Sequence, residues 1–140
     1  MRRFAWRGLW ALLAWVVAVP AAAQRSPGRP AFALEEPRAN PVLPAALVPF
    51  TISPEICRQG HVPRVELRVY NPLSQVEATL RLHDRPSVVL DSIPLKCGDY
   101  VAQWDGSVGG GTRAASPGLY TIRLSVDGVG LAKKLIFTPP

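Results

Sequence analysis

Seven short segments in which apolar and polar residues alternate predict an all-β fold for this 140-residue chain. Alternation with a period of two is typical of half-buried strands. Turn sequences separate the segments about every ten residues, and no segment has the periodicity of a helix. This pattern is typical of a seven-stranded immunoglobulin-like Greek-key sandwich. We therefore predict one β-sandwich domain, residues 48–140, preceded by a signal peptide, residues 1–23, and an extended proline-rich linker, residues 24–47.

Residues 64–70 have the clearest strand pattern, since Val65, Leu67 and Val69 share one face. Further along, Asp127-Gly128 predicts a tight hairpin turn. The predicted strands are residues 48–52, 64–70, 75–83, 88–90, 99–104, 119–126 and 129–137, with a glycine-rich loop at 106–118. The positions expected to face inward predict a core of Val65, Leu67, Val69, Val76, Leu80, Leu82, Trp104, Tyr120, Ile122, Leu124, Val126 and Leu135.

The first 23 residues have the three parts of a secretory signal peptide. Arginines precede the apolar run Gly8–Val19, and Ala21-Ala22-Ala23 offers the small residues that a signal peptidase needs before Gln24. The uninterrupted apolar stretch from Gly8 to Ala23 is about 16 residues long, which is short of the roughly 20 that a membrane-spanning helix needs. The leader predicts a secreted or periplasmic protein, with an uncleaved membrane anchor as the alternative.

The charge balance argues against a nucleic-acid partner. The chain has 16 basic and 10 acidic residues, and three of the arginines lie in the leader, so the remainder has 13 against 10, a net charge of about +3. A balance this small indicates neither nucleic-acid binding nor a polybasic membrane patch.

Cys57 and Cys97 are the only cysteines, and export would place them where disulfides persist. We predict a bridge between them, with two buried free thiols as the alternative. A zinc site is disfavoured because neither cysteine belongs to a C-x-x-C pair and because His61 and His83 complete no ligand set.

The linker contains prolines at positions 27, 30, 37, 41 and 44 and has no apolar periodicity. Proline at this density keeps the backbone extended, so we expect a semi-rigid spacer outside the core. The alternative is an arm that docks on a partner through Phe32 and Leu34.

The sequence Trp104-Asp105-Gly106 predicts a strand end followed by a reversal. Trp104 would bury its ring, Asp105 would accept hydrogen bonds from loop N–H groups, and Gly106 would take a positive φ. Downstream, Gly118-Leu119-Tyr120 starts an alternating strand, and the Tyr120 hydroxyl is expected to act as a tyrosine corner does.

These motifs, together with Lys133-Lys134-Leu135-Ile136, resemble the small Ig-like domain of the flagellar hook-capping protein, over about 90 residues. The resemblance implies a freestanding copy of a domain that occurs across secreted bacterial proteins. It implies no role in flagellar assembly, because no hook-capping N-terminal segment accompanies it. Nor does it imply a C-terminal sorting role, because no cargo precedes the domain. The loop after Gly106 lacks the family's second acidic residue, so Asp105 stands short of the oxygen ligands that Ca²⁺ needs.

No catalytic constellation is apparent, and we predict no catalytic residue, cofactor or metal. His61 and His83 lie in a turn-like segment and at a strand end, which suits surface residues better than general bases. Gly109-Gly110-Gly111 lacks the Gly-Lys-Ser/Thr ending of a phosphate loop.

The expected function is therefore binding: an accessory or adaptor module that docks on an envelope protein by a sheet face or edge. The alternatives are a structural spacer and a small carbohydrate-binding module. The candidate contact residues are Phe32 and Leu34 in the linker and Val108, Thr112 and Arg113 in the loop.

Overall fold

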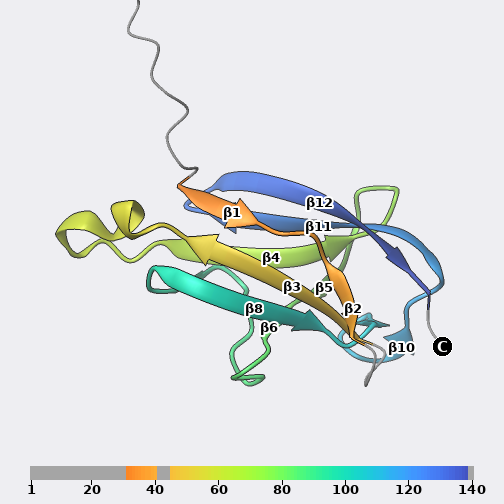
Figure 1. Ribbon diagram of the computed structural model, residues 1–140. Coiled ribbons are helices and arrows are strands. Elements are labelled where there is room, and N and C mark those ends of the chain that lie inside the picture. The colour runs from red at the N-terminus through yellow and green to blue at the C-terminus, as the bar shows by residue number, and fades with distance from the viewer. Residues whose placement is uncertain (1–30, 41–44, 139–140) are drawn as a thin grey trace, which may run out of the picture.

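The computed structural model describes residues 31–40 and 45–138 (Figure 1). The predicted signal peptide lies outside the described residues. The fold is all-β, as predicted, and its strands pair antiparallel. The elements are β1 (Phe32–Leu34), β2 (Arg38–Asn40), β3 (Ala45–Ile52), the 3-10 helix η1 (Pro54–Gly60), β4 (Arg64–Tyr70), β5 (Val76–Thr79), β6 (Arg81–Leu82), β7 (Ile93–Pro94), β8 (Gly98–Trp104), β9 (Ser107–Val108), β10 (Arg113–Ala114), β11 (Gly118–Val126) and β12 (Val129–Phe137).

Two larger sheets form a sandwich. In the first sheet the strand order is β1-β3-β8-β6, and β2 also pairs with β3. In the second sheet the order is β12-β11-β4-β5, and β7 also pairs with β4. Strands β9 and β10 form a separate two-stranded hairpin. In Figure 1 the strands β3 and β8 lie side by side as one layer, with β11 and β12 in the other.

The core lies between the sheets and consists of alternate residues of the paired strands. On β4 the buried residues are Val65, Leu67 and Val69, and the long strands β3 and β11 repeat this alternation. All the predicted core residues are buried except Val76, whose exposure is 50%. The prediction for Val76 was wrong because a β-bulge shifts the register of β5 and pairs this residue with Tyr70 at the sheet edge.

The predicted strand 75–83 changes sheets midway, so it is two strands rather than one. Its first part, β5, pairs with β4, and its second part, β6, pairs with β8. At the crossing, Leu67 donates its N–H to Leu90, Leu90 donates to Leu80, and Leu80 donates to Leu67, at 2.9–3.0 Å. These hydrogen bonds satisfy backbone groups of three fully buried leucines at the point where the regular strand pairing is interrupted. Of the predicted strand 88–90, only Val89 forms a bridge, with Arg81.

The predicted linker is not outside the core where the structure describes it. Strand β1 pairs with the second half of β3, and Phe32 and Leu34 are 9% and 6% exposed. These two side chains therefore belong to the sandwich and are not free anchors for a partner. Strand β2 pairs with the first half of β3. The sheet structure thus begins at Phe32, ahead of the boundary predicted at residue 48.

The segment between β3 and β4 holds the predicted disulfide and one short helix that the sequence pattern did not predict. Pro54 starts η1, where its missing N–H costs nothing. Cys57 in this helix is bonded to Cys97, next to the start of β8, with a Cα–Cα distance of 6.1 Å. The bond, as predicted, ties the connection to the start of β8 in the first sheet.

Candidate functional site

The Trp104-Asp105-Gly106 turn has the local geometry that the sequence predicts. The indole N–H of Trp104 donates to the carbonyl of Ser107 at 2.8 Å. Asp105 accepts both the backbone N–H and the hydroxyl of the same serine through Oδ1. Gly106 has φ +79°, a backbone conformation that glycine adopts readily and that residues with a side chain rarely adopt. Asp105 thus holds the turn closed through one of its two carboxylate oxygens.

Aromatic packing links this turn to the second sheet. The Trp104 ring centroid lies 5.3 Å from that of Tyr120 and 5.0 Å from that of Phe137. The Tyr120 hydroxyl donates to the carbonyl of Ser116 at 2.6 Å, four residues upstream, which is the contact expected of a tyrosine corner. This cluster joins the two sheets at one end of the sandwich.

The glycine-rich loop is more ordered than predicted, because β9 and β10 pair within it. Val108 is 5% exposed, so it packs inward and is unavailable as the partner contact that was expected. Thr112 and Arg113 are exposed, as a contact role requires. The Thr112 hydroxyl donates to the carbonyl of Gly109 at 2.7 Å and closes the tip of the hairpin.

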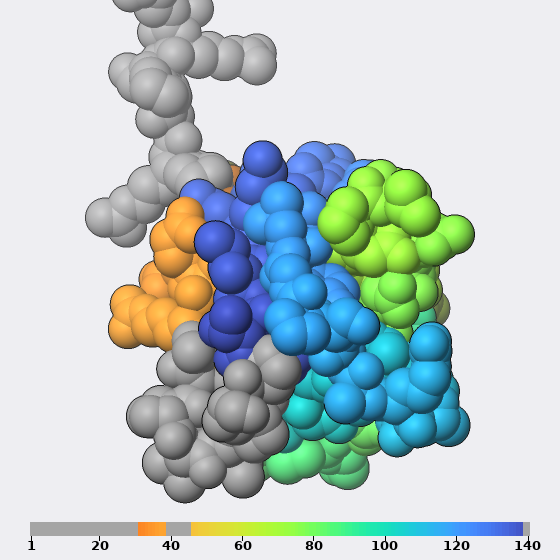
Figure 2. Space-filling model, turned by 90° about the vertical axis from the view of Figure 1, so that its right-hand side faces the viewer, coloured from red at the N-terminus to blue at the C-terminus, as the bar shows by residue number. Residues whose placement is uncertain are grey.

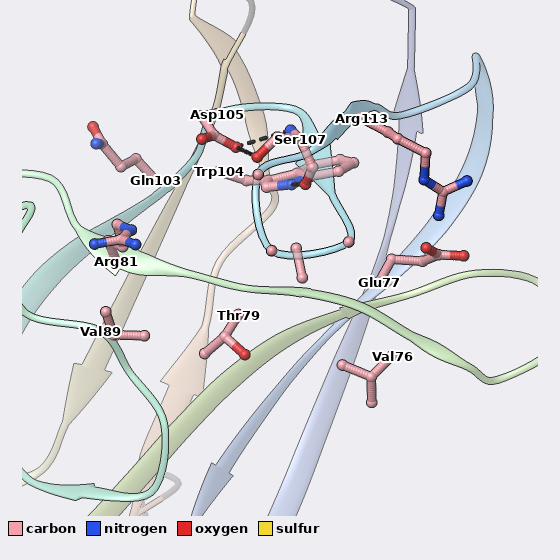
Figure 3. Close-up of a pocket in the computed structure, with 14 residues that line it drawn as sticks. Val76, Glu77, Thr79, Arg81, Val89, Gln103, Trp104, Asp105, Ser107 and Arg113 are labelled. Carbon is pink, nitrogen blue, oxygen red and sulfur yellow. Dashed lines mark hydrogen bonds between the residues drawn. The ribbon is translucent and has the colours of Figure 1, made fainter.

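A groove of about 510 Å³ opens beside this hairpin (Figure 3). Strand β5 forms one wall, and the hairpin with the end of β8 forms the other. In Figure 3, Trp104 lies against the hairpin, while Arg113 and Glu77 stand on opposite sides toward one end. Arg81 and Gln103 line the other end. The lining of the groove therefore includes guanidinium, carboxylate and amide groups that can form hydrogen bonds with a ligand.

Neither histidine lines this groove, although His83 is bonded to Gln103 at its rim. His61 Nε2 is 2.8 Å from Asp127 Oδ2 at the β11–β12 turn. This hydrogen bond lowers the pKa of Asp127, and a weaker contribution in the same direction comes from the hydrogen bond that the backbone N–H of Arg64 donates to it. His83 Nδ1 pairs with Gln103 Oε1 at 2.8 Å. In the described residues neither ring is hydrogen-bonded to a hydroxyl or a thiol, and no three potential metal-ligating side chains gather there.

The free edge of β12, which has β1 as a close but unpaired neighbour, is a second candidate surface. This nine-residue strand ends the second sheet, and within residues 31–40 and 45–138 no strand pairs with its outer side (Figure 1). Figure 2 shows the end where β12 finishes: its dark-blue residues reach the surface between the orange β1–β2 segment and the lighter blue approach to β11.

The ladder register identifies the unpaired backbone groups of β12. Asp127 donates its N–H to the carbonyl of Arg64, so the pair Val126–Val65 is of the non-hydrogen-bonded kind. Val126 therefore directs its N–H and C=O toward Val129 on β12. From Val129 onward, alternate residues bond to β11. Those between them direct both backbone groups to the free edge: Gly130, Ala132, Lys134 and Ile136.

Comparisons with protein families, curated proteins and solved structures found no match for this chain. In the part of the chain that the structure describes, no helix has the length and apolar character needed to cross a membrane.

Proposed function

We propose that this protein is an exported, non-catalytic immunoglobulin-like module that binds an envelope protein by strand addition to β12. The observation that carries the proposal is the row of unpaired backbone groups along this long edge strand. Main-chain hydrogen bonds to an added strand supply affinity, and pockets for alternate side chains supply specificity. No cofactor or metal takes part in such binding.

The immunoglobulin-like part of the proposal is supported by the strand orders. The order β1-β3-β8-β6 corresponds to the A-B-E-D sheet of that fold, and β12-β11-β4-β5 corresponds to G-F-C-C′. The hydrogen bond of Tyr120 near the start of β11 corresponds to the tyrosine corner of strand F. The resemblance to the hook-capping type of Ig-like domain stays a proposal that rests on Trp104-Asp105-Gly106 and the Gly118-Leu119-Tyr120 strand.

Export is proposed from the leader, whose basic start, apolar run and Ala21-Ala22-Ala23 are those of a cleavable signal. Mass spectrometry of the protein isolated from the expressing cell should give a chain that begins at Gln24. A chain that retains residues 1–23 would indicate an anchor instead.

A proline at Ala132 tests strand addition directly. Ala132→Pro removes an N–H from the free edge, whereas the ladder to β11 loses nothing, and proline is tolerated on edges of this kind. We expect a partner captured from envelope extract by the tagged wild type to be bound at least about tenfold more weakly by this variant. Ala132→Thr, which keeps the N–H, is the matched control and should bind as the wild type does.

Circular dichroism and thermal unfolding of both variants should show that the sandwich is intact. Equal capture by the proline variant and the threonine control would refute the edge as the docking site. If the wild type captures no partner, the module is a spacer and the proposed function is wrong.

A further inference from the structure

The residues that direct their backbone to the free edge of β12 also share one face of the second sheet. Gly130, Ala132, Lys134 and Ile136 alternate along the strand, and their partners on β11 are Ser125, Arg123, Thr121 and Leu119. Directly opposite side chains in a sheet lie close enough to interact. The side chains of an added strand would therefore contact Lys134, Ile136 and the side chain that reaches over Gly130.

That side chain is Arg123. A Cβ placed on Gly130 would lie 2.6 Å from Arg123 Nε and 2.8 Å from Nη2, so the guanidinium occupies the space over this glycine. Arg68 stands directly opposite Arg123 on β4, and like charges in that position repel. The guanidinium therefore reaches from β11 over Gly130 of β12.

Neither Arg123 nor Lys134 has an acidic partner among the residues that the structure describes. Two nearby cations, Arg68 and Lys133, do have acidic partners. Arg68 Nη2 donates to Asp91 Oδ1 at 2.8 Å, and Lys133, on the opposite face of β12, lies 3.2 Å from Glu36. Two uncompensated positive charges therefore adjoin the unpaired backbone row.

An apolar pair completes this surface. Ile136 is 75% exposed and lies directly across from Leu119, which is 42% exposed. Since Ile136 is two positions from Lys134, an added strand would meet an apolar site and then a basic site at alternate residues.

We propose that the partner segment is an extended acidic strand, with an aliphatic residue opposite Ile136 and acidic residues opposite Lys134 and Ala132, the second within reach of Arg123. This inference rests on the proposed function and adds the chemistry of its partner. A second copy of this chain is disfavoured as the occupant, because lysines on an edge strand repel an identical edge.

The test is a titration of the isotope-labelled protein, followed by nuclear magnetic resonance, with the peptide Thr-Val-Thr-Glu-Thr-Glu-Thr, which matches an antiparallel added strand. A peptide with lysine in place of both glutamates is the control ligand. We expect the acidic peptide to bind more tightly and to shift the amide signals of Gly130, Ala132, Lys134 and Ile136. Lys134→Glu should weaken acidic-peptide binding roughly fivefold and strengthen lysine-peptide binding. Lys133→Gln, on the other face, should change neither.

Equal binding of both peptides, abolished by Ala132→Pro, would overturn the acidic partner and leave strand addition standing. Binding of the acidic peptide that survives Ala132→Pro would overturn the docking edge itself. Binding of neither peptide would overturn the acidic partner, and capture from envelope extract would then decide separately on the proposed function. A dimer of the wild type in sedimentation, lost in Ala132→Pro, would assign the edge to a second copy and also overturn the inference.

Discussion

Replacing both Cys57 and Cys97 with serine should remove a large part of the free energy of unfolding. The bond joins residues separated by 40 positions, so its loss frees a loop of about 41 residues in the unfolded chain. Chain entropy for a loop of this length gives about 13 cal/mol/K, or about 4 kcal/mol at 25 °C. A small domain has about 5–15 kcal/mol in total. Serine is the suitable replacement because its oxygen can still accept the N–H of residue 97, which lies 3.2 Å from Cys57 Sγ.

The assay is equilibrium unfolding in urea, followed by circular dichroism. With a slope of about 1.5 kcal/mol/M, the midpoint should fall by about 2.5 M, and the melting temperature should fall by about 20 °C. Wild-type protein with a reductant should unfold at the same midpoint as the double variant. A loss below about 1 kcal/mol would refute the reasoning, because it would mean that the bridged loop is already restricted in the unfolded chain.

Three further predictions concern packing, one hydrogen bond and one charge. Leu80→Ala should cost about 3 kcal/mol because Leu80 is fully buried, whereas Val76→Ala should change the urea midpoint little; equal costs would contradict the bulge that turns Val76 outward. Tyr120→Phe should cost about 1 kcal/mol in the same assay by removing the 2.6 Å bond to Ser116, and an unchanged midpoint would mean that this bond contributes nothing. Asp127 has a lowered pKa in the folded state, so its charge stabilises the fold above about pH 4, the ordinary value, and the contribution is lost as the pH falls through the folded value. Asp127→Asn should therefore melt at a lower temperature than the wild type at pH 7, with a difference that shrinks toward pH 2.5; a constant difference would be inconsistent with a charge effect.

Long strands with one buried face were predictable from the sequence. The predicted residues 64–70 and 129–137 coincide with β4 and β12. Strand β4 buries one row of side chains and exposes the other, whereas β12 buries only Leu135 and Phe137 at its end. The turn at Trp104 was also predictable, since its hydrogen bonds join residues within three positions of one another. The disulfide followed from the presence of only two cysteines in a chain predicted to be exported.

Strands that depend on distant partners were not predictable. Strand β1 has three residues, too few for periodicity, and exists because β3 pairs with it. Val108 gave no sign of burial, because it lies in a glycine-rich stretch and its burial depends on how the β9–β10 hairpin folds back onto the core. The proline content of residues 24–47 indicated an extended backbone, which is equally compatible with an edge strand.

The candidate binding surfaces were likewise predictable from the sequence only in part. Lys133-Lys134 and Ile136 could be placed on a strand from the sequence, but nothing local indicated that the strand would end a sheet. The groove also required the fold, since β5 and the β9–β10 hairpin are separated by about 30 residues and meet only across the sandwich.

By itself, the sequence determined the class of structure, because the alternation of side chains is a property of each strand alone. It also predicted the Trp104 turn and the bridge between the two cysteines, with free thiols as the alternative that the structure excludes. Only the tertiary structure decided which strands became edges, where the register shifted and which cations kept no partner. Those features depend on contacts between residues far apart in the chain, and the proposed binding surface consists of them.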